Sequence, residues 1–394
     1  MQKKYLFLFF LLSIYSNFKA QNQLSVYSEV SIVTAGPGEE LYEAFGHTAI
    51  RIKDPILNLD LIYNYGVFDF NQPNFYSNFA KGNMIYSLAR YDFKYFLASY
   101  KRDKRWLKQQ VLNLTQQEKQ NYFTFLEKNA SPKNRNYKYD PYFNNCATIL
   151  RDITKNTLGN KVVFNNNKEK ELTFRQLTNN EIYWNSWGTF ALNLIAGTKL
   201  DQIASFEEQM FLPDYVYSSF KDATVFIKNQ PEKLIQKESI LLDFKEKAPT
   251  SSIFSPFLIF VILTILVIYI TYKDFKNNKI TKWLDFILFF TTGFIGSILC
   301  FLWFFSSHLT APNNFNCLWA FAPNLIVAFL LLKNNPKKWL TYYYKILVIL
   351  LLIIPILWVF KIQVFTITTI PLLILLFVRY FYLSKKRLNL EKLK

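Results

Sequence analysis

The sequence predicts two joined parts, a soluble α+β domain followed by a bundle of five transmembrane helices. Charged, polar and apolar residues are mixed over the first 250 residues, whereas long apolar runs dominate after Phe254. Within the first part, alternating segments typical of strands stand beside segments with helical spacing. The predicted boundaries are 1–20 for a signal peptide, 21–250 for an exported domain, 251–383 for the membrane domain and 384–394 for a cytoplasmic tail.

The N-terminus has the pattern of a secretory signal. Lys3 and Lys4 precede an apolar run, and Lys19-Ala20 closes it. The run is shorter than a comfortable membrane span. Cleavage after Ala20 and retention as an anchor both remain open, and either one exports the residues that follow.

Local patterns predict the elements of the exported domain. The predicted strands are 24–34, 48–53 and 59–68, with a further strand or short extended element at 91–100. Thr115 and Glu118 form a capping box at the start of a helix over 115–128. A second helix is predicted over 146–157, a polar loop over 165–171, and a partly extended stretch over 228–249.

Five apolar runs predict the membrane spans, and the charges between them predict the topology. The runs are 254–272, 284–305, 317–332, 342–360 and 364–383. The loops 273–282 and 333–338 carry four and three lysines, whereas 306–316 carries no lysine or arginine. Because cations gather on the cytoplasmic side, the pattern places the first domain outside and the C-terminus in the cytoplasm.

The net charge of +18 does not indicate nucleic-acid binding. Many of the cations flank apolar runs, and an exported domain meets no nucleic acid. A basic surface toward anionic phospholipid headgroups fits the same charge.

Cys146 and His47 are the leading candidates for chemistry. They are the sole cysteine and histidine of the first 250 residues, and they begin a predicted helix and a predicted strand. A helix start and a nearby imidazole both favour the reactive thiolate. A third polar group would orient the imidazole, with Asn64 as the first choice and Asp60 as the second.

The other cysteines and the metal-binding residue types suggest no further chemistry. Cys300 and Cys317 lie in apolar runs, where packing is the simplest role. One histidine and one cysteine cannot close a zinc site, so no metal or cofactor is expected.

Four segments resemble one known family. Residues 34–51, 63–70 and 137–152 resemble the Lnb N-terminal periplasmic domain family, and 308–316 resembles that family's periplasmic loop between its second and third spans. The resemblance extends to permuted papain-like proteins of the NlpC/P60 and lecithin–retinol acyltransferase types. It therefore implies a permuted papain-like periplasmic domain.

The same resemblance implies a lipoprotein N-acyltransferase of the inner membrane. A phospholipid would be the acyl donor, and a diacylated lipoprotein would be the acceptor. The resemblance makes Cys146 the nucleophile, His47 the base and Asn64 the polar residue of the neighbouring strand.

A second set of residues is expected to bind substrate. These residues are Tyr42, Arg51, Asn145, His308, Asn313 and Asn316. Arg51 has a salt-bridge role as its alternative, and His308 a structural role at the membrane face. Two other functions remain open, a cell-wall peptidase of NlpC/P60 type and a non-catalytic membrane scaffold.

Overall fold

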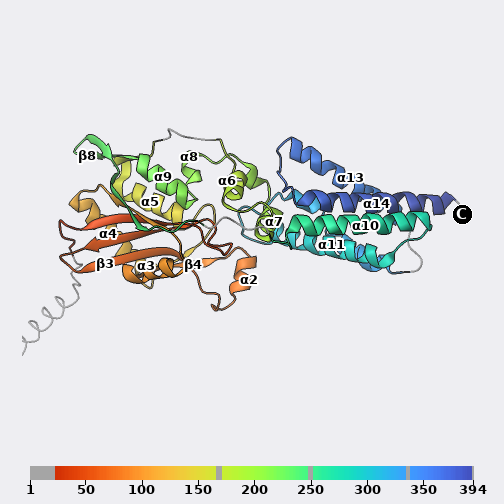
Figure 1. The fold of residues 1–394 in the computed structure, drawn as a ribbon, viewed down its shortest axis with the longest axis horizontal. Coiled ribbons are helices and arrows are strands. Elements are labelled where there is room, and N and C mark those ends of the chain that lie inside the picture. The colour runs from red at the N-terminus through yellow and green to blue at the C-terminus, as the bar shows by residue number, and fades with distance from the viewer. Residues whose placement is uncertain (1–22, 166–170, 247–251, 334–337, 393–394) are drawn as a thin grey trace, which may run out of the picture.

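The computed structural model describes residues 23–165, 171–246, 252–333 and 338–392. The expected signal peptide and most of the expected 165–171 loop lie outside these residues. Figure 1 shows two parts arranged along the long axis, an N-terminal part with sheets and helices and a helical C-terminal part.

An antiparallel seven-stranded sheet organises the N-terminal part, with the order β10-β5-β1-β2-β3-β4-β6. Its strands are β1 (Glu29–Ala35), β2 (His47–Asp54), β3 (Leu59–Val67), β4 (Ile85–Asp92), β5 (Leu107–Leu112), β6 (Asn136–Lys138) and β10 (Ile235–Leu242). A smaller sheet contains β7 (Val162–Val163), β8 (Thr224–Ile227) and β9 (Gln230–Lys233). The central strands are buried on both faces, so helices cover the sheet on each side.

Eight described α-helices accompany these sheets. They are α2 (Phe75–Ala80), α3 (Phe93–Arg102), α4 (Gln116–Ala130), α5 (Cys146–Leu158), α6 (Phe174–Glu181), α7 (Trp187–Ile195), α8 (Phe206–Gln209) and α9 (Pro213–Asp222). Helices α4, α5 and α9 pack on one face of the large sheet, with Ile50 and Ile52 in their shared core. Helix α3 packs on the other face against Ala49 and Ile62.

Most local predictions for this part are confirmed. The structure has the strands β1, β2 and β3, the helix α5, and the capping box of Thr115 and Glu118 on α4. The strand expected at 91–100 is wrong, because the chain leaves β4 at Asp92 and enters α3. Phe93, Phe96 and Tyr100 recur at helical spacing and are buried on one side of this helix.

The C-terminal part contains five described α-helices, but a bundle of five spanning helices is not confirmed. The helices are α10 (Pro256–Lys276), α11 (Lys282–Phe304), α12 (Asn324–Leu331), α13 (Trp339–Val359) and α14 (Thr369–Lys392). Among the described residues, α10, α11 and α13 are long and apolar enough to cross a membrane.

The expected third span at 317–332 differs most from its prediction. It forms the 3₁₀ turn η3 (Phe315–Leu318) and the eight-residue α12, which follows Pro323. Eight helical residues extend only about 12 Å, and the hydrocarbon core is about 30 Å thick. The segment packs on α11 instead, where a Cβ on Gly296 would lie 2.0 Å from the backbone oxygen of Ala320.

Buried charges join three helices of this part. Arg379 of α14 is fully buried and pairs with Asp274 and Asp285, which belong to α10 and α11. Buried charges are tolerated when they are paired and hydrogen-bonded. The three side chains therefore fix these helices to one another.

The two parts meet at the 3₁₀ turn η2 (Thr198–Asp201). The N–H of Gly197 donates to the carbonyl of Thr310 at 2.8 Å. Asp201 accepts from the backbone N–H of Val364 at 3.1 Å and from the guanidinium of Arg175 at 2.8 Å. Arg175 and Asp201 are buried, with side-chain exposures of 2% and 4%. This ion pair therefore stabilises the junction from within.

Replacing Arg175 with methionine should destabilise the protein strongly. The change leaves the Asp201 carboxylate buried without its cation, which costs about 3–5 kcal/mol. Scanning calorimetry in detergent should show a clearly lower Tm. Lys155→Ala is the control, because its pair with Glu207 is half exposed and contributes about 0–1 kcal/mol. Equal Tm values for the two variants would contradict the role given to Arg175.

Candidate active site

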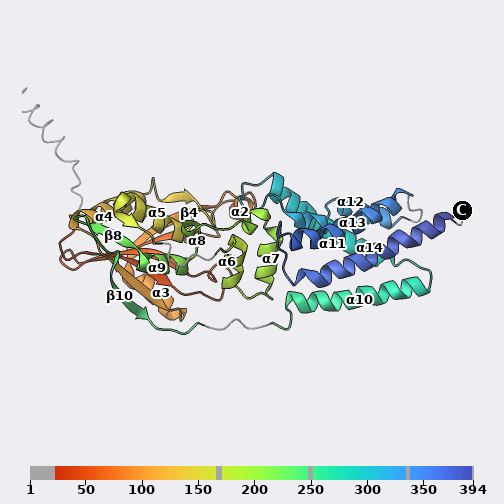
Figure 2. The same ribbon diagram turned by 90° about the horizontal axis from the view of Figure 1, so that it is seen from above.

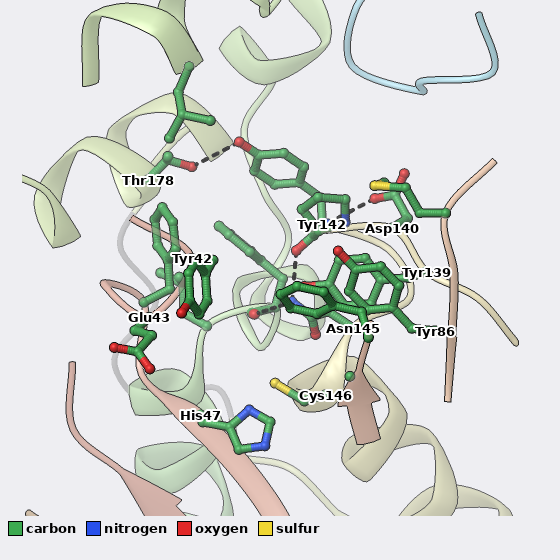
Figure 3. A pocket seen from close by; sticks show the side chains of 18 of the residues that line it. Tyr42, Glu43, His47, Tyr86, Tyr139, Asp140, Tyr142, Asn145, Cys146 and Thr178 are labelled. Carbon is green, nitrogen blue, oxygen red and sulfur yellow. Dashed lines mark hydrogen bonds between the residues drawn. The ribbon is translucent and has the colours of Figure 1, made fainter. Parts of the chain in front are cut away.

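A cavity of about 600 Å³ lies at the end of the N-terminal part that faces the helical part. Cys146, His47 and Asn64 line it, and Figure 3 shows the first two turned toward each other. Leu192 of α7 and Leu302 of α11 line it as well, so both parts of the chain contribute walls. The volume is typical of ligand sites, which measure about 300–1,000 Å³.

Asn145 positions Cys146 as the first residue of α5. Its side-chain oxygen accepts from the N–H groups of Ala147 and Thr148, both at 2.9 Å. Its amide nitrogen donates to the carbonyls of Pro141 and Phe211 at 2.7 and 2.8 Å. The thiol thus sits at the positive end of a helix that is firmly held at its start.

His47 opens β2 and is held by Asn64 of the neighbouring β3. The distance from His47 Nε2 to Asn64 Oδ1 is 2.6 Å. Asn64 Nδ2 donates to the hydroxyl of Tyr91 at 3.2 Å, which orients the amide with its oxygen toward the imidazole. His47 Nε2 therefore carries the proton, and Nδ1 is the nitrogen left for Cys146.

The backbone at Gly66 lies close to both Cys146 and His47. It has a φ of +94°, and a Cβ added there would lie 3.9 Å from both Cys146 Cβ and His47 Cε1. Figure 3 shows both side chains at the base of the same pocket. Each of the two side chains shifts the pKa of the other, as expected for groups this close together.

The environment favours the charged forms of this pair. Burial alone would raise the pKa of Cys146, but the positive charge of His47 and the N–H of Thr48 lower it below its usual range. Burial alone would lower the pKa of His47, but Cys146 and Asn64 raise it. A thiolate beside an imidazolium is the reactive form of a cysteine nucleophile.

Asp60 and Arg51 lie outside the cavity lining and bind each other. Arg51 Nε and Nη2 donate to the two carboxylate oxygens of Asp60, both at 2.7 Å. The Arg51 guanidinium also stacks over the ring of Phe93 at 3.7 Å. Arg51 thus forms the salt bridge that was its alternative role and does not line this cavity, and Asn64 rather than Asp60 contacts His47.

The three asparagines of the expected substrate set also have internal roles. The amide of Asn145 lines the cavity but caps α5, as described above. Asn316 donates to the carbonyl of Leu194 at 3.1 Å and accepts from Trp319 at 2.9 Å. Asn313 adopts a φ of +56° at the junction. Asn313 and Asn316 do not line the cavity, because their loop packs against η2 and α7.

Tyr42 and His308 do line the cavity, as a substrate role requires. Tyr42 contacts Phe68 edge to face, with ring centroids 5.8 Å apart. His308 lies on the loop after α11, and its Nε2 is 2.8 Å from the carbonyl oxygen of Phe79. His308 thus brings the helical part into contact with α2.

Four further residues that were not among the expected site residues line the cavity: Glu43, Tyr86, Arg105 and Tyr139. Arg105 is buried, and its Nη1 lies 3.2 Å from Oε1 of Glu43. Tyr139 stacks on Tyr86 with ring centroids 4.1 Å apart. Tyr86 and Arg105 lie outside the segments that resemble the family, and folding brings them to the cavity from distant positions. Among the residues that the structure describes, no three His, Cys, Asp or Glu side chains are grouped to hold a metal.

Fold and site together define a membrane protein whose folded N-terminal domain carries a buried Cys–His pair at its membrane-facing end. The family model of the Lnb N-terminal periplasmic domain matches residues 15–180. The model of the Lnb transmembrane domain matches residues 248–389. The two matches together cover most of the chain, which therefore belongs to the Lnb family.

Membership confirms the resemblance carried by the sequence motifs. It gives the chain a periplasmic N-terminal part and a transmembrane C-terminal part, and the family implies an acyltransferase. No curated protein and no solved structure matched the chain. The permuted papain-like fold therefore stays a prediction.

The pair should appear in the pH dependence of thiol alkylation. Cys146 should react with iodoacetamide at a lower pH than an ordinary thiol, because the thiolate is the reacting form. In His47→Ala, burial raises the pKa of Cys146 without the opposing charge of the imidazole. The alkylation profile of Cys146 should therefore move to higher pH. Mass spectrometry of the peptide containing Cys146 separates it from Cys300 and Cys317.

His308→Ala is the matched control for this measurement, because that histidine lines the same cavity but bonds to Phe79. Its alkylation profile should stay at the wild-type pH. An unshifted profile in His47→Ala would show that the imidazole does not control the thiol.

Proposed function

We propose that this protein is a lipoprotein N-acyltransferase. It transfers an acyl chain from a phospholipid to the α-amine of a diacylated lipoprotein's N-terminal cysteine, through a thioester on Cys146. The observation that supports this most directly is the Cys146–His47–Asn64 array on the wall of a cavity shared with the membrane part. Family membership supports the same activity.

In the first half-reaction, the Cys146 thiolate attacks the ester carbonyl of the phospholipid. A carbon–sulfur bond forms, and the ester carbon–oxygen bond breaks as the tetrahedral intermediate collapses. The His47 imidazolium gives its proton to the departing glycerol oxygen. A lysophospholipid leaves, and the acyl chain remains on Cys146.

In the second half-reaction, the neutral α-amine attacks the thioester. His47 accepts a proton from the nitrogen as the carbon–nitrogen bond forms. The carbon–sulfur bond then breaks and restores the Cys146 thiolate beside the imidazolium. Asn64 keeps the imidazole in the orientation that both proton transfers require.

The tetrahedral oxyanion needs donors close to Cys146. The N–H of Cys146 belongs to the first turn of α5, where backbone donors have no partner within the helix. Tyr139 lines the same cavity and offers a hydroxyl as a second donor. A Tyr139→Phe variant removes this hydroxyl and keeps the ring.

The cavity walls favour a lipid over a hydrophilic peptide. The lining is mainly aromatic and aliphatic, with Phe45, Phe68, Leu192, Ile195 and Leu302 among its members. Such walls suit an acyl chain and exclude the water that would hydrolyse the thioester. A cell-wall peptidase would need a polar groove, and a scaffold would need no charged pair of this kind.

Cys146→Ala should leave cellular lipoproteins diacylated. The substitution removes the atom that carries the acyl chain, so the product should be undetectable by mass spectrometry of lipoprotein N-termini. Cys317→Ala is the control and should retain activity. Altered muropeptides with normal lipoproteins would favour the peptidase, and unchanged function in Cys146→Ala would favour the scaffold.

Purified protein should accumulate a thioester when phospholipid is supplied without acceptor. Intact-mass measurement should show one acyl chain on Cys146, released by neutral hydroxylamine. Because His47 transfers protons in both steps, His47→Ala should form this adduct about 10²–10⁴-fold more slowly. An acyl adduct on another residue would contradict the assignment of the nucleophile.

A further inference from the structure

An aromatic segment beside the cavity has no role in the chemistry described so far. Residues 68–82, here called the flap, contain α2 and follow β3. Phe68 and Phe75 pack inward, on Tyr86 and on each other. Tyr76 and Phe79 are exposed by 74% and 49%, although large aromatic side chains are normally buried. Figures 1 and 2 show α2 at the end of the sheet domain nearest the helical part.

The helical part holds the flap by its backbone. The carbonyl of Phe79 lies 2.8 Å from His308 Nε2, and the carbonyl of Lys81 accepts from the N–H of Ser307 at 2.7 Å. Gly82 permits this close approach, since an added Cβ would lie 2.6 Å from the backbone nitrogen of His308. The flap therefore sits against the loop that leaves α11.

Exposed apolar side chains continue from the flap onto the ends of the membrane helices. Phe305 and Leu309, next to the flap, are exposed by 74% and 57%. Phe254 precedes α10, and its carbonyl accepts from the indole of Trp187 at 2.7 Å. Aromatic side chains at helix ends are typical of the boundary between membrane and water. The flap is continuous with this boundary.

The flap and the α11 loop also form part of the cavity that contains Cys146. Phe79 and Ala80 line it from the flap, and His308, Thr310 and Ala311 line it from the loop. The seam between these two segments thus separates the membrane boundary from the nucleophile. An acyl chain that crosses this seam reaches the thiol without entering water.

We propose that the flap is a lipid-binding surface seated in the periplasmic leaflet, and that its seam with residues 302–311 is the entrance for the donor acyl chain. The occupant is a phospholipid of that leaflet. The entrance rests on the proposed acyl transfer, whereas the lipid contact of the flap does not. His308 acts as a positioning residue that fastens the flap to the loop.

Photo-crosslinking in membranes tests the surface. The full chain is reconstituted in vesicles of phosphatidylethanolamine and phosphatidylglycerol, with the photoreactive residue benzoylphenylalanine replacing Tyr76 or Tyr95. Tyr95 is a matched control, because it is exposed by 61% and belongs to α3, a helix that lies away from the helical part in Figure 1. Position 76 should give a phospholipid adduct and position 95 should not. Equal labelling, or none at position 76, overturns the proposal.

Kinetics test the entrance. Tyr76→Asp should raise KM for vesicle phospholipid about tenfold or more, since a charge at the membrane boundary opposes insertion. It should leave acylation of Cys146 by a water-soluble short-chain thioester unchanged, because the pair at Cys146 is intact. Tyr95→Asp should change neither. Equal losses on both substrates, or no change in KM, overturn the entrance.

A Cys146→Ala background separates the two proposals. The crosslink at position 76 should persist there, because it requires no chemistry. If the crosslink at position 76 persists and the wild-type chain shows no acyl transfer, the proposed function and the entrance are both overturned. The lipid-binding surface alone would then be supported.

Discussion

The amide of Asn145 is the interaction on which the site depends. It accepts two backbone N–H groups of α5 and donates to carbonyls of two other segments, at Pro141 and Phe211. Four bonds from one buried side chain leave the helix start little freedom, so the Cys146 thiol has one position relative to β2. An anchor of this kind satisfies the N–H groups that a helix start otherwise leaves unpaired. The arrangement at His47 follows from that fixed position.

Burial imposes the electrostatics of the pair. Burial in the cavity would by itself raise the pKa of the Cys146 thiol and lower that of His47, but the interaction between the two residues outweighs both effects. The ionised pair is favoured because the charge of each partner stabilises the charge of the other, which replaces the hydration that burial removes. Asn64 completes the pair through the opposite ring nitrogen of His47. The three residues therefore form one unit, and each depends on the other two for its charge or orientation.

Local signals made part of this architecture predictable. A capping box and a strand alternation each depend on a few neighbouring residues, so α4 and β2 could be predicted from sequence. Cys146 and His47 could be singled out because their residue types are rare in the first 250 residues. Arg51 shares the His47 strand, but its guanidinium bonds to Asp60 outside the cavity. Arg105 reaches the cavity only through folding of distant segments. The expected third span is not confirmed, because apolar composition alone does not distinguish a crossing helix from a short helix that follows a packed turn such as η3.

The junction makes the membrane part more than an anchor. Asp201 accepts bonds from Arg175 within the periplasmic part and from Val364 of the helical part. The loop that follows α11 supplies His308 and Ala311 to the cavity wall. A periplasmic part separated from its helices would lose these walls and expose the thiol to water. In the proposed acyl transfer, water would hydrolyse the thioester, so the walls that the helical part supplies would favour the amine over water as acceptor.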